Sequence, residues 1–102
     1  MYVEMRTTDE FDKWIKGLRD VRGRSHILRR LREIEFYGEL FGDYKRLGNS
    51  LIELRFHMGP GYRVYLMQEN DMLTILLVGG DKSSQKKDIS RARKMVKELK
   101  KL

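Results

Sequence analysis

The sequence predicts an α+β fold: an N-terminal strand and two helices, then a four-stranded, mainly antiparallel sheet, then a C-terminal helix. Three observations support this order. Apolar residues recur every three or four positions before Gly38, alternate with polar residues through much of 42–80, and then return to helical spacing. We expect the helices on one side of the sheet. The 102 residues contain no linker or repeat and suit one hydrophobic core, so residues 1–102 form a single domain.

The N-terminal segment is predicted to form a short strand and a short helix. Residues 1–6 form the strand, with Val3 and Met5 facing the core. Residues 7–10 (TTDE) are typical of a capping box, in which Thr7 accepts from the Glu10 amide and Glu10 accepts from the Thr7 amide. The helix that follows has one apolar face and places Trp14 in the core; this face consists of Phe11, Trp14, Ile15 and Leu18.

A second helix is predicted from Val21 to Tyr37, with Gly38 as its C-terminal cap. Its buried stripe consists of Ile27, Leu28, Leu31 and Ile34. Its opposite face carries Arg22, Arg24, Arg29, Arg30 and Arg32. Such a face is more often solvated than functional, but it also suits contact with a nucleic acid or an acidic partner.

From Gly42 the pattern becomes alternating. Residues 43–47 form a short strand, 48–50 a tight turn and 51–58 a second strand. In the second strand Ile52, Leu54, Phe56 and Met58 point to one side, whereas Glu53, Arg55 and His57 point to the other. This alternation is typical of a strand with one buried face. Residues 59–61 (GPG) then make a sharp reversal.

The returning strand covers residues 62–68, with Val64 and Leu66 on the core side. Residues 69–71 form a turn, and the nearly continuous apolar run 72–78 predicts a central strand. Gly79 and Gly80 are expected to free the chain to turn. The last helix begins at Ser83 or Ser84 and runs to the end, with a buried stripe of Ile89, Ala92, Val96 and Leu99.

The composition indicates a basic protein without cysteine. Its net charge of +7 favours a phosphate-rich partner such as a nucleic acid, although solubility alone also requires charge. The absence of cysteine excludes a disulfide scaffold and fits the cytoplasm, where we expect the protein; no apolar run has the length of a signal or membrane segment. We predict no metal site and no cofactor, because His26 and His57 lie far apart and no Walker-type loop is present.

Three cations are predicted to converge at one end of the sheet. The alternation places Arg55 and Arg63 on the same outer face, and Lys82 emerges beside the N-terminus of the last helix, which favours anions. With the ring of Tyr65 nearby, this surface suits RNA phosphates and a stacked base. The alternative is a solvated sheet face stabilised by cross-strand ion pairs. Further candidates for RNA contact are Lys45, Arg46 and Lys86.

Four segments carry a family resemblance: 53–55 (ELR), 59–65 (GPGYRVY), 77–85 (LVGGDKSSQ) and 88–89 (DI). Together they resemble the addiction-module killer proteins, the phage Gp49-like and HigB-like members of the RelE/ParE toxin superfamily, over essentially the whole chain. The resemblance implies the toxin of a type II toxin–antitoxin pair. RelE-like toxins cut messenger RNA, usually on the ribosome, and HigB-like toxins are commonly paired with a helix-turn-helix antitoxin that also represses the operon.

The resemblance therefore implies a metal-free messenger RNA endonuclease that inhibits translation. Its partners would be the antitoxin, messenger RNA and the ribosome, with operator DNA reached only through the antitoxin. Two alternatives stay open: an inhibitor of DNA gyrase, as ParE-like members are, and a non-catalytic module that binds antitoxin or DNA.

Catalytic residues are carried over by position. Arg63 matches the arginine that contacts the scissile phosphate, Lys82 matches a basic residue after the last strand, and Arg55 lies on the strand that supplies the other cations. RelE-type enzymes have a tyrosine early in the last helix, where this sequence has Asp88 or Ile89. The proton-transfer group is therefore open, with His57 or Glu53 as candidates.

Overall fold

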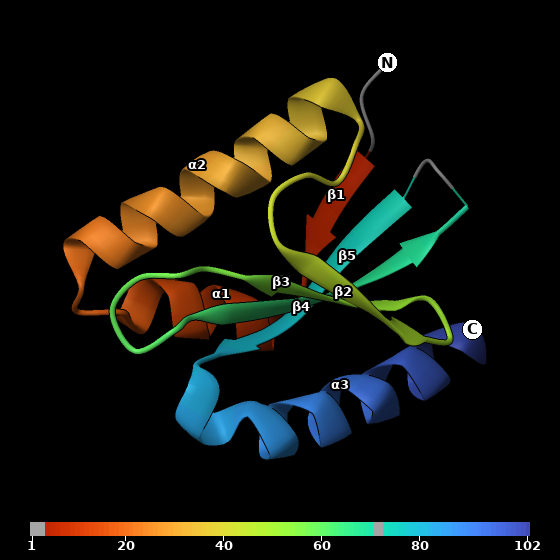
Figure 1. The fold of residues 1–102 in the computed structure, drawn as a ribbon. Helices are drawn as coiled ribbons and strands as arrows, with labels where there is room; N and C mark the ends of the chain where they lie inside the picture. Colours follow the sequence, from red (N-terminus) through yellow and green to blue (C-terminus); the bar gives the residue numbers. More distant parts are fainter. Residues whose placement is uncertain (1–3, 71–72) are drawn as a thin grey trace.

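The computed structural model describes residues 4–70 and 73–102. Its elements follow the order β1 (Glu4–Thr7), α1 (Asp9–Gly17), α2 (Val21–Tyr37), β2 (Tyr44–Gly48), β3 (Leu51–Arg55), β4 (Arg63–Glu69), β5 (Leu73–Gly80), the 3₁₀ turn η1 (Lys82–Ser84) and α3 (Gln85–Lys100) (Figure 1). The predictions for Val3, for the end of the 69–71 turn and for Met72 lie outside the described residues. None of the helices in the described residues has both the length and the apolar character needed to span a membrane.

The predicted α+β fold is confirmed. The five strands form one sheet in the order β1-β5-β4-β3-β2, in which β1 runs parallel to β5 and the other neighbours are antiparallel. The N-terminal strand thus joins the four later ones at an edge. The β2–β3 turn is confirmed by positive φ angles at Asn49 and Ser50, whereas β3 ends at Arg55, three residues before its predicted end.

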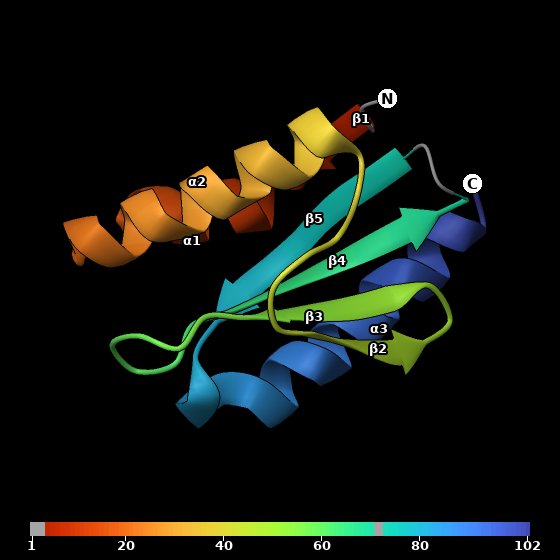
Figure 2. The same ribbon diagram turned by 45° about the horizontal axis from the view of Figure 1, so that its top comes forward.

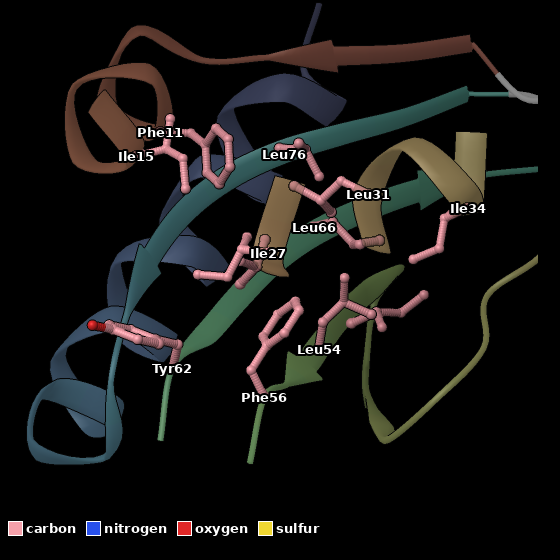
Figure 3. Packing of buried hydrophobic residues seen from close by; sticks show 12 residues of the cluster. Phe11, Ile15, Ile27, Leu31, Ile34, Leu54, Phe56, Tyr62, Leu66 and Leu76 are labelled. Carbon is pink, nitrogen blue, oxygen red and sulfur yellow. The ribbon is translucent and has the colours of Figure 1, made fainter. Parts of the chain in front are cut away.

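The helices cover both faces of the sheet, so the prediction that they lie on one side is wrong. Helices α1 and α2 pack on one face, whereas α3 packs on the other (Figures 1 and 2). The first core contains Phe11, Ile15, Ile27, Leu31, Ile34, Leu54, Phe56, Tyr62, Leu66 and Leu76 (Figure 3). The second contains Leu51, Tyr65, Met67, Leu77, Val78, Ala92, Met95 and Val96. The sheet face predicted to be exposed is therefore buried beneath α3.

Helix α1 begins one residue later than the sequence predicted, and the Thr7–Glu10 capping box is wrong. Thr7 still pairs with Leu76 in the sheet, so Thr8 becomes the N-cap and accepts from the Phe11 amide at 3.0 Å. Glu10 instead pairs with Arg91 of α3, at 2.9 Å. Trp14 is half-buried and packs against the first core.

Helix α2 has its predicted bounds, and Gly38 caps it with a φ of 73°. The prediction that Leu28 belongs to the core is wrong, since its exposed fraction is 37%. It lies about 100° around the helix from Ile27, outside the stripe that faces the sheet.

The arginine face of α2 is not uniformly solvated. Arg30 donates to the carbonyls of Phe41, Asp43 and Arg55, at 2.7, 2.9 and 2.6 Å. Its guanidinium also lies 4.8 Å from the centre of the Phe56 ring. Arg30 therefore anchors the irregular segment before β2, and the end of β3, to the helix.

Gly79 and Gly80 belong to β5, so their predicted role in the turn is wrong. They permit close packing instead: a Cβ on Gly79 would overlap the Trp14 ring, and one on Gly80 would overlap the Asp88 carboxylate. The chain turns one residue later, where Asp81 caps η1 by accepting from the Ser83 amide at 2.8 Å. Ser84 is the N-cap residue of α3, but its side chain makes no capping hydrogen bond.

This packing predicts the effect of a methyl group. We expect Gly79→Ala to lower the free energy of unfolding by roughly 1–3 kcal/mol, because Trp14 must move out of its site. Gly17→Ala is the matched control: its Cβ would meet no atom within 4 Å, and we expect a small gain in stability. Urea unfolding measures both; equal stability of Gly79→Ala and the wild type would contradict this packing.

Candidate functional site

The β3–β4 connection and η1 lie near each other at one end of the sheet (Figures 1 and 2). An open cleft lies between them. Its volume is about 500 Å³, and its lining consists of His57, Met58, Gly59, Pro60, Gly61, Arg63 and Lys82. Three of the four residues predicted as catalytic therefore line one cleft, and the fourth, Arg55, lies directly opposite Arg63 in the β3–β4 register.

Arg63 and Lys82 approach each other across Gly61. Arg63 is only 6% exposed, and its Nη1 donates to the Gly61 carbonyl at 2.8 Å. A Cβ on Gly61, whose φ is 76°, would lie 3.0 Å from this Nη1 and 3.2 Å from Lys82 Cγ. Glycine therefore both permits the turn and leaves room for the two cations.

The Nε of Arg63 is buried and has no hydrogen-bond partner within residues 4–70 and 73–102. Buried donors are nearly always paired, because an unpaired one loses its hydration without compensation. The Nε itself does not face the solvent, but Arg63 lines the cleft together with Lys82. Two cations in the lining of one cleft suit an anion.

Arg55 is held by a buried carboxylate. Its Nε lies 2.8 Å from Glu53 Oε1, and 29% of its side chain is exposed. Glu53 is only 1% exposed and also accepts from Tyr65 at 2.9 Å and from Gln85 at 2.8 Å. Burial opposes its charge, but the hydrogen bonds from Gln85, Arg55 and Tyr65 outweigh burial and hold the Glu53 pKa below its ordinary value.

Tyr65 does not supply the predicted stacking ring. It is fully buried in the second core, beneath α3, and its hydroxyl donates to Glu53. Burial and this carboxylate raise the pKa of Tyr65 well above its ordinary value, which removes it as a proton-transfer group at neutral pH.

His57 lies in the cleft with its ring bonded to Asp43. It lines the cleft, 73% of its side chain is exposed, and its Nε2 lies 2.5 Å from Asp43 Oδ2. The hydrogen bond from His57 is the main cause that lowers the pKa of Asp43, so this carboxylate is charged at neutral pH and can orient the ring.

The three predicted RNA-contacting cations lie outside this cleft. Lys45 and Arg46 are exposed on β2 but face opposite sides of the sheet, since their register partners are Glu53 and Ile52. Lys86 is exposed in the first turn of α3. The structure therefore does not bring these three into one surface.

Asp88, one of the two positions at which the resemblance implied a tyrosine, is buried. It accepts from the Ser84 hydroxyl at 2.6 Å and packs against Gly80. Its geometry is that of a structural contact between α3 and β5. Within the described residues, no group of three or more His, Cys, Asp or Glu side chains could hold a metal ion.

Sequence reasoning did not identify Gln85 or Asp43. Gln85 lies 32 residues from Glu53 along the chain, and no spacing rule links a helix residue to a strand residue at that distance. Asp43 could have been found, because the β2–β3 hairpin register brings it beside Arg55, whose amide donates to the Asp43 carbonyl.

Comparison with known proteins identifies a relative and a fold. No family model matches the chain. An uncharacterised protein of Haemophilus influenzae is 42% identical over 99 residues, covering 97% of this chain and 98% of that protein. A mutant of the E. coli toxin RelE in the free state has a TM-score of 0.73 at 15% identity, over 93% of this chain and 98% of its own. The intact E. coli RelBE toxin–antitoxin complex has a TM-score of 0.58 at 14% identity, over 79% and 96%.

The Glu53 contacts predict a pH-dependent stability. We expect Glu53→Gln to lower the free energy of unfolding by about 2 kcal/mol or more at neutral pH, because a buried charged acceptor is lost. Since folding lowers the pKa of Glu53, its contribution is complete above the ordinary value of 4.5 and is lost as the pH falls through the folded value.

Chemical unfolding of the wild type and of Glu53→Gln, from neutral pH into acid, measures the effect. The difference between their free energies of unfolding should become smaller in acid. Glu39→Gln, at an exposed position, is the control and should change little. A difference in unfolding free energy that stays constant from neutral pH into acid would contradict the assignment of a charged Glu53.

Proposed function

Since the chain belongs to the same family as the Haemophilus influenzae protein and has the fold of the toxin RelE, we propose that it is the toxin of a type II toxin–antitoxin pair, a metal-free endonuclease that cuts messenger RNA on the ribosome and so inhibits translation. The observation that carries this proposal is the open cleft whose lining brings together Arg63, Lys82 and His57. The net charge of +7 agrees with a phosphate-rich substrate.

Arg63 and Lys82 bind the scissile phosphate. Cleavage of RNA by its own 2′-hydroxyl gives a pentacoordinate phosphate with more negative charge than the starting diester. Cations fixed before the reaction stabilise that charge without having to reorganise. Arg63 is fixed by its bond to the Gly61 carbonyl, and its planar donors match phosphate oxygens. Arg55 lies directly opposite Arg63 on the neighbouring strand, but its charge is paired with Glu53.

His57 transfers the proton. Imidazole has an intrinsic pKa near neutrality, so it can take a proton from the 2′-hydroxyl or give one to the leaving 5′-oxygen. Asp43 lies in hydrogen-bond contact with Nε2 of the ring and holds its orientation. Glu53 is unsuited to this role, because its two oxygens are already bonded to three buried or half-buried donors.

The proposed partner is a helix-turn-helix antitoxin, which neutralises this protein and carries it to operator DNA. Support for an antitoxin comes from the RelBE toxin–antitoxin complex, which shares the fold. We expect the protein to act in the cytoplasm, where messenger RNA and ribosomes are found.

The test is induction in bacteria that lack the antitoxin, with transcript 5′ ends mapped within minutes. We expect new ends inside translated regions for the wild type. Arg63→Ala and Lys82→Ala should lower the cleavage rate by roughly 10²-fold or more, the effect of losing one such charge stabiliser.

Lys94→Ala is the charge-matched control, since Lys94 is exposed on α3 outside the cleft, and it should cut normally. Lys82 is also exposed, so its variant separates lost chemistry from the lost stability that the buried Arg63 could cause. Growth arrest without new ends would favour gyrase as the target. No growth defect and no new ends would favour a non-catalytic binding module.

A further inference from the structure

A second cleft lies beside the one at Arg63 and Lys82. Met58 lines both clefts, and the second has a volume of about 390 Å³. The rest of the second lining belongs to the start of α2: Val21, Arg22, Ser25, His26 and Arg29. The two clefts therefore adjoin across a single side chain.

Asp20 fixes the two clefts relative to each other. As the N-cap of α2, it accepts from the Gly23 amide at 3.0 Å and from the Tyr62 hydroxyl at 2.9 Å. Tyr62 directly follows the 59–61 turn, and a Cβ on Gly23 would lie only 2.6 Å from its ring. The first turn of α2 is thus packed on the residues that form the first cleft.

Four of the five arginines of α2 divide into two groups. Arg24 and Arg30 donate to backbone carbonyls and hold the fold together. Arg22 and Arg29 are exposed and line the second cleft. The ion pair of Arg29 with Glu33 is exposed, with 77% and 41% of the two side chains accessible, so a phosphate can replace Glu33 at little cost.

The second cleft also has an accessible ring. His26 is exposed, and its plane makes an angle of 81° with that of Phe56, so the two rings do not stack. Bases in single strands stack on imidazole as well as on larger rings, while cations on either side hold the phosphates. His26 therefore provides an exposed ring on which a base can stack, whereas the ring of Tyr65 is buried.

We propose that the second cleft binds the nucleotide next to the one held at Arg63 and Lys82. Single-stranded RNA then runs from the first cleft over Met58 onto α2, with Arg22 and Arg29 on phosphates and His26 under a base. This inference rests on the proposed function and adds a subsite to it. An acidic peptide would also be attracted by the two arginines, but the exposed ring and the position beside an anion-binding cleft favour nucleic acid.

The test is the length dependence of binding. The probes are 2′-O-methyl oligouridines of two and six nucleotides, which bind but cannot be cut, titrated by NMR. We expect Arg22→Gln/Arg29→Gln to bind the dinucleotide normally and the hexanucleotide roughly tenfold more weakly. The slope of log K against log salt should fall by about 1.4, or about 0.7 for each lost phosphate contact. His26→Ala should weaken the hexanucleotide roughly fivefold or more.

Arg32→Gln/Lys94→Gln is the matched control, because it removes the same charge from exposed positions outside both clefts. Unchanged hexanucleotide affinity in the Arg22/Arg29 variant would overturn the proposal, and so would equal losses in the control or with the dinucleotide. If the Arg22/Arg29 variant bound the antitoxin more weakly but the hexanucleotide normally, the cleft would be assigned to a protein partner. This result would also overturn the proposal. Because the probes cannot be cut, a length-dependent loss of binding together with no new transcript 5′ ends on induction would reject the endonuclease and keep the subsite.

Discussion

The buried carboxylate of Glu53 is the contact on which the candidate site depends. A charge that is 1% exposed is costly unless donors surround it, and here the donors come from β3, β4 and α3. The same bonds hold Arg55 in place and fix the start of α3 against the sheet. Because η1 leads directly into α3, this fixation also determines where Lys82 meets Arg63.

On the opposite face, α2 holds the irregular segments of the chain. Arg30 satisfies three carbonyls around the segment before β2, and Asp20 ties the residue after the 59–61 turn to the start of the helix. Connections without ladder hydrogen bonds need such partners to keep one shape. The cleft-forming turn is therefore held to the start of α2 through Tyr62 and Asp20.

Some basic residues stabilise the fold and others line the clefts, and the net charge does not distinguish the two kinds. Arg24, Arg30 and Arg55 are engaged with carbonyls or a carboxylate, whereas Arg22, Arg29 and Lys82 line the two clefts. Arg63 belongs to both groups, since one nitrogen is bonded to Gly61 and another is unpaired. A charge of +7 indicates a partner, but the division shows which cations are available to it.

The sequence by itself determined the elements and much of their pairing, because these follow from local periodicity and turn residues. The bounds of α2, the turn at Asn49 and Ser50, and the facing of Arg55 and Arg63 all came from spacing. Only the tertiary structure decided that α3 covers the second sheet face, since a polar strand residue can be either solvated or bonded within a buried cluster. That one placement buried Glu53 and Tyr65, brought Gln85 to them, and made Gly79 and Gly80 packing residues rather than hinges. These contacts join residues far apart in the chain, and no local pattern encodes them.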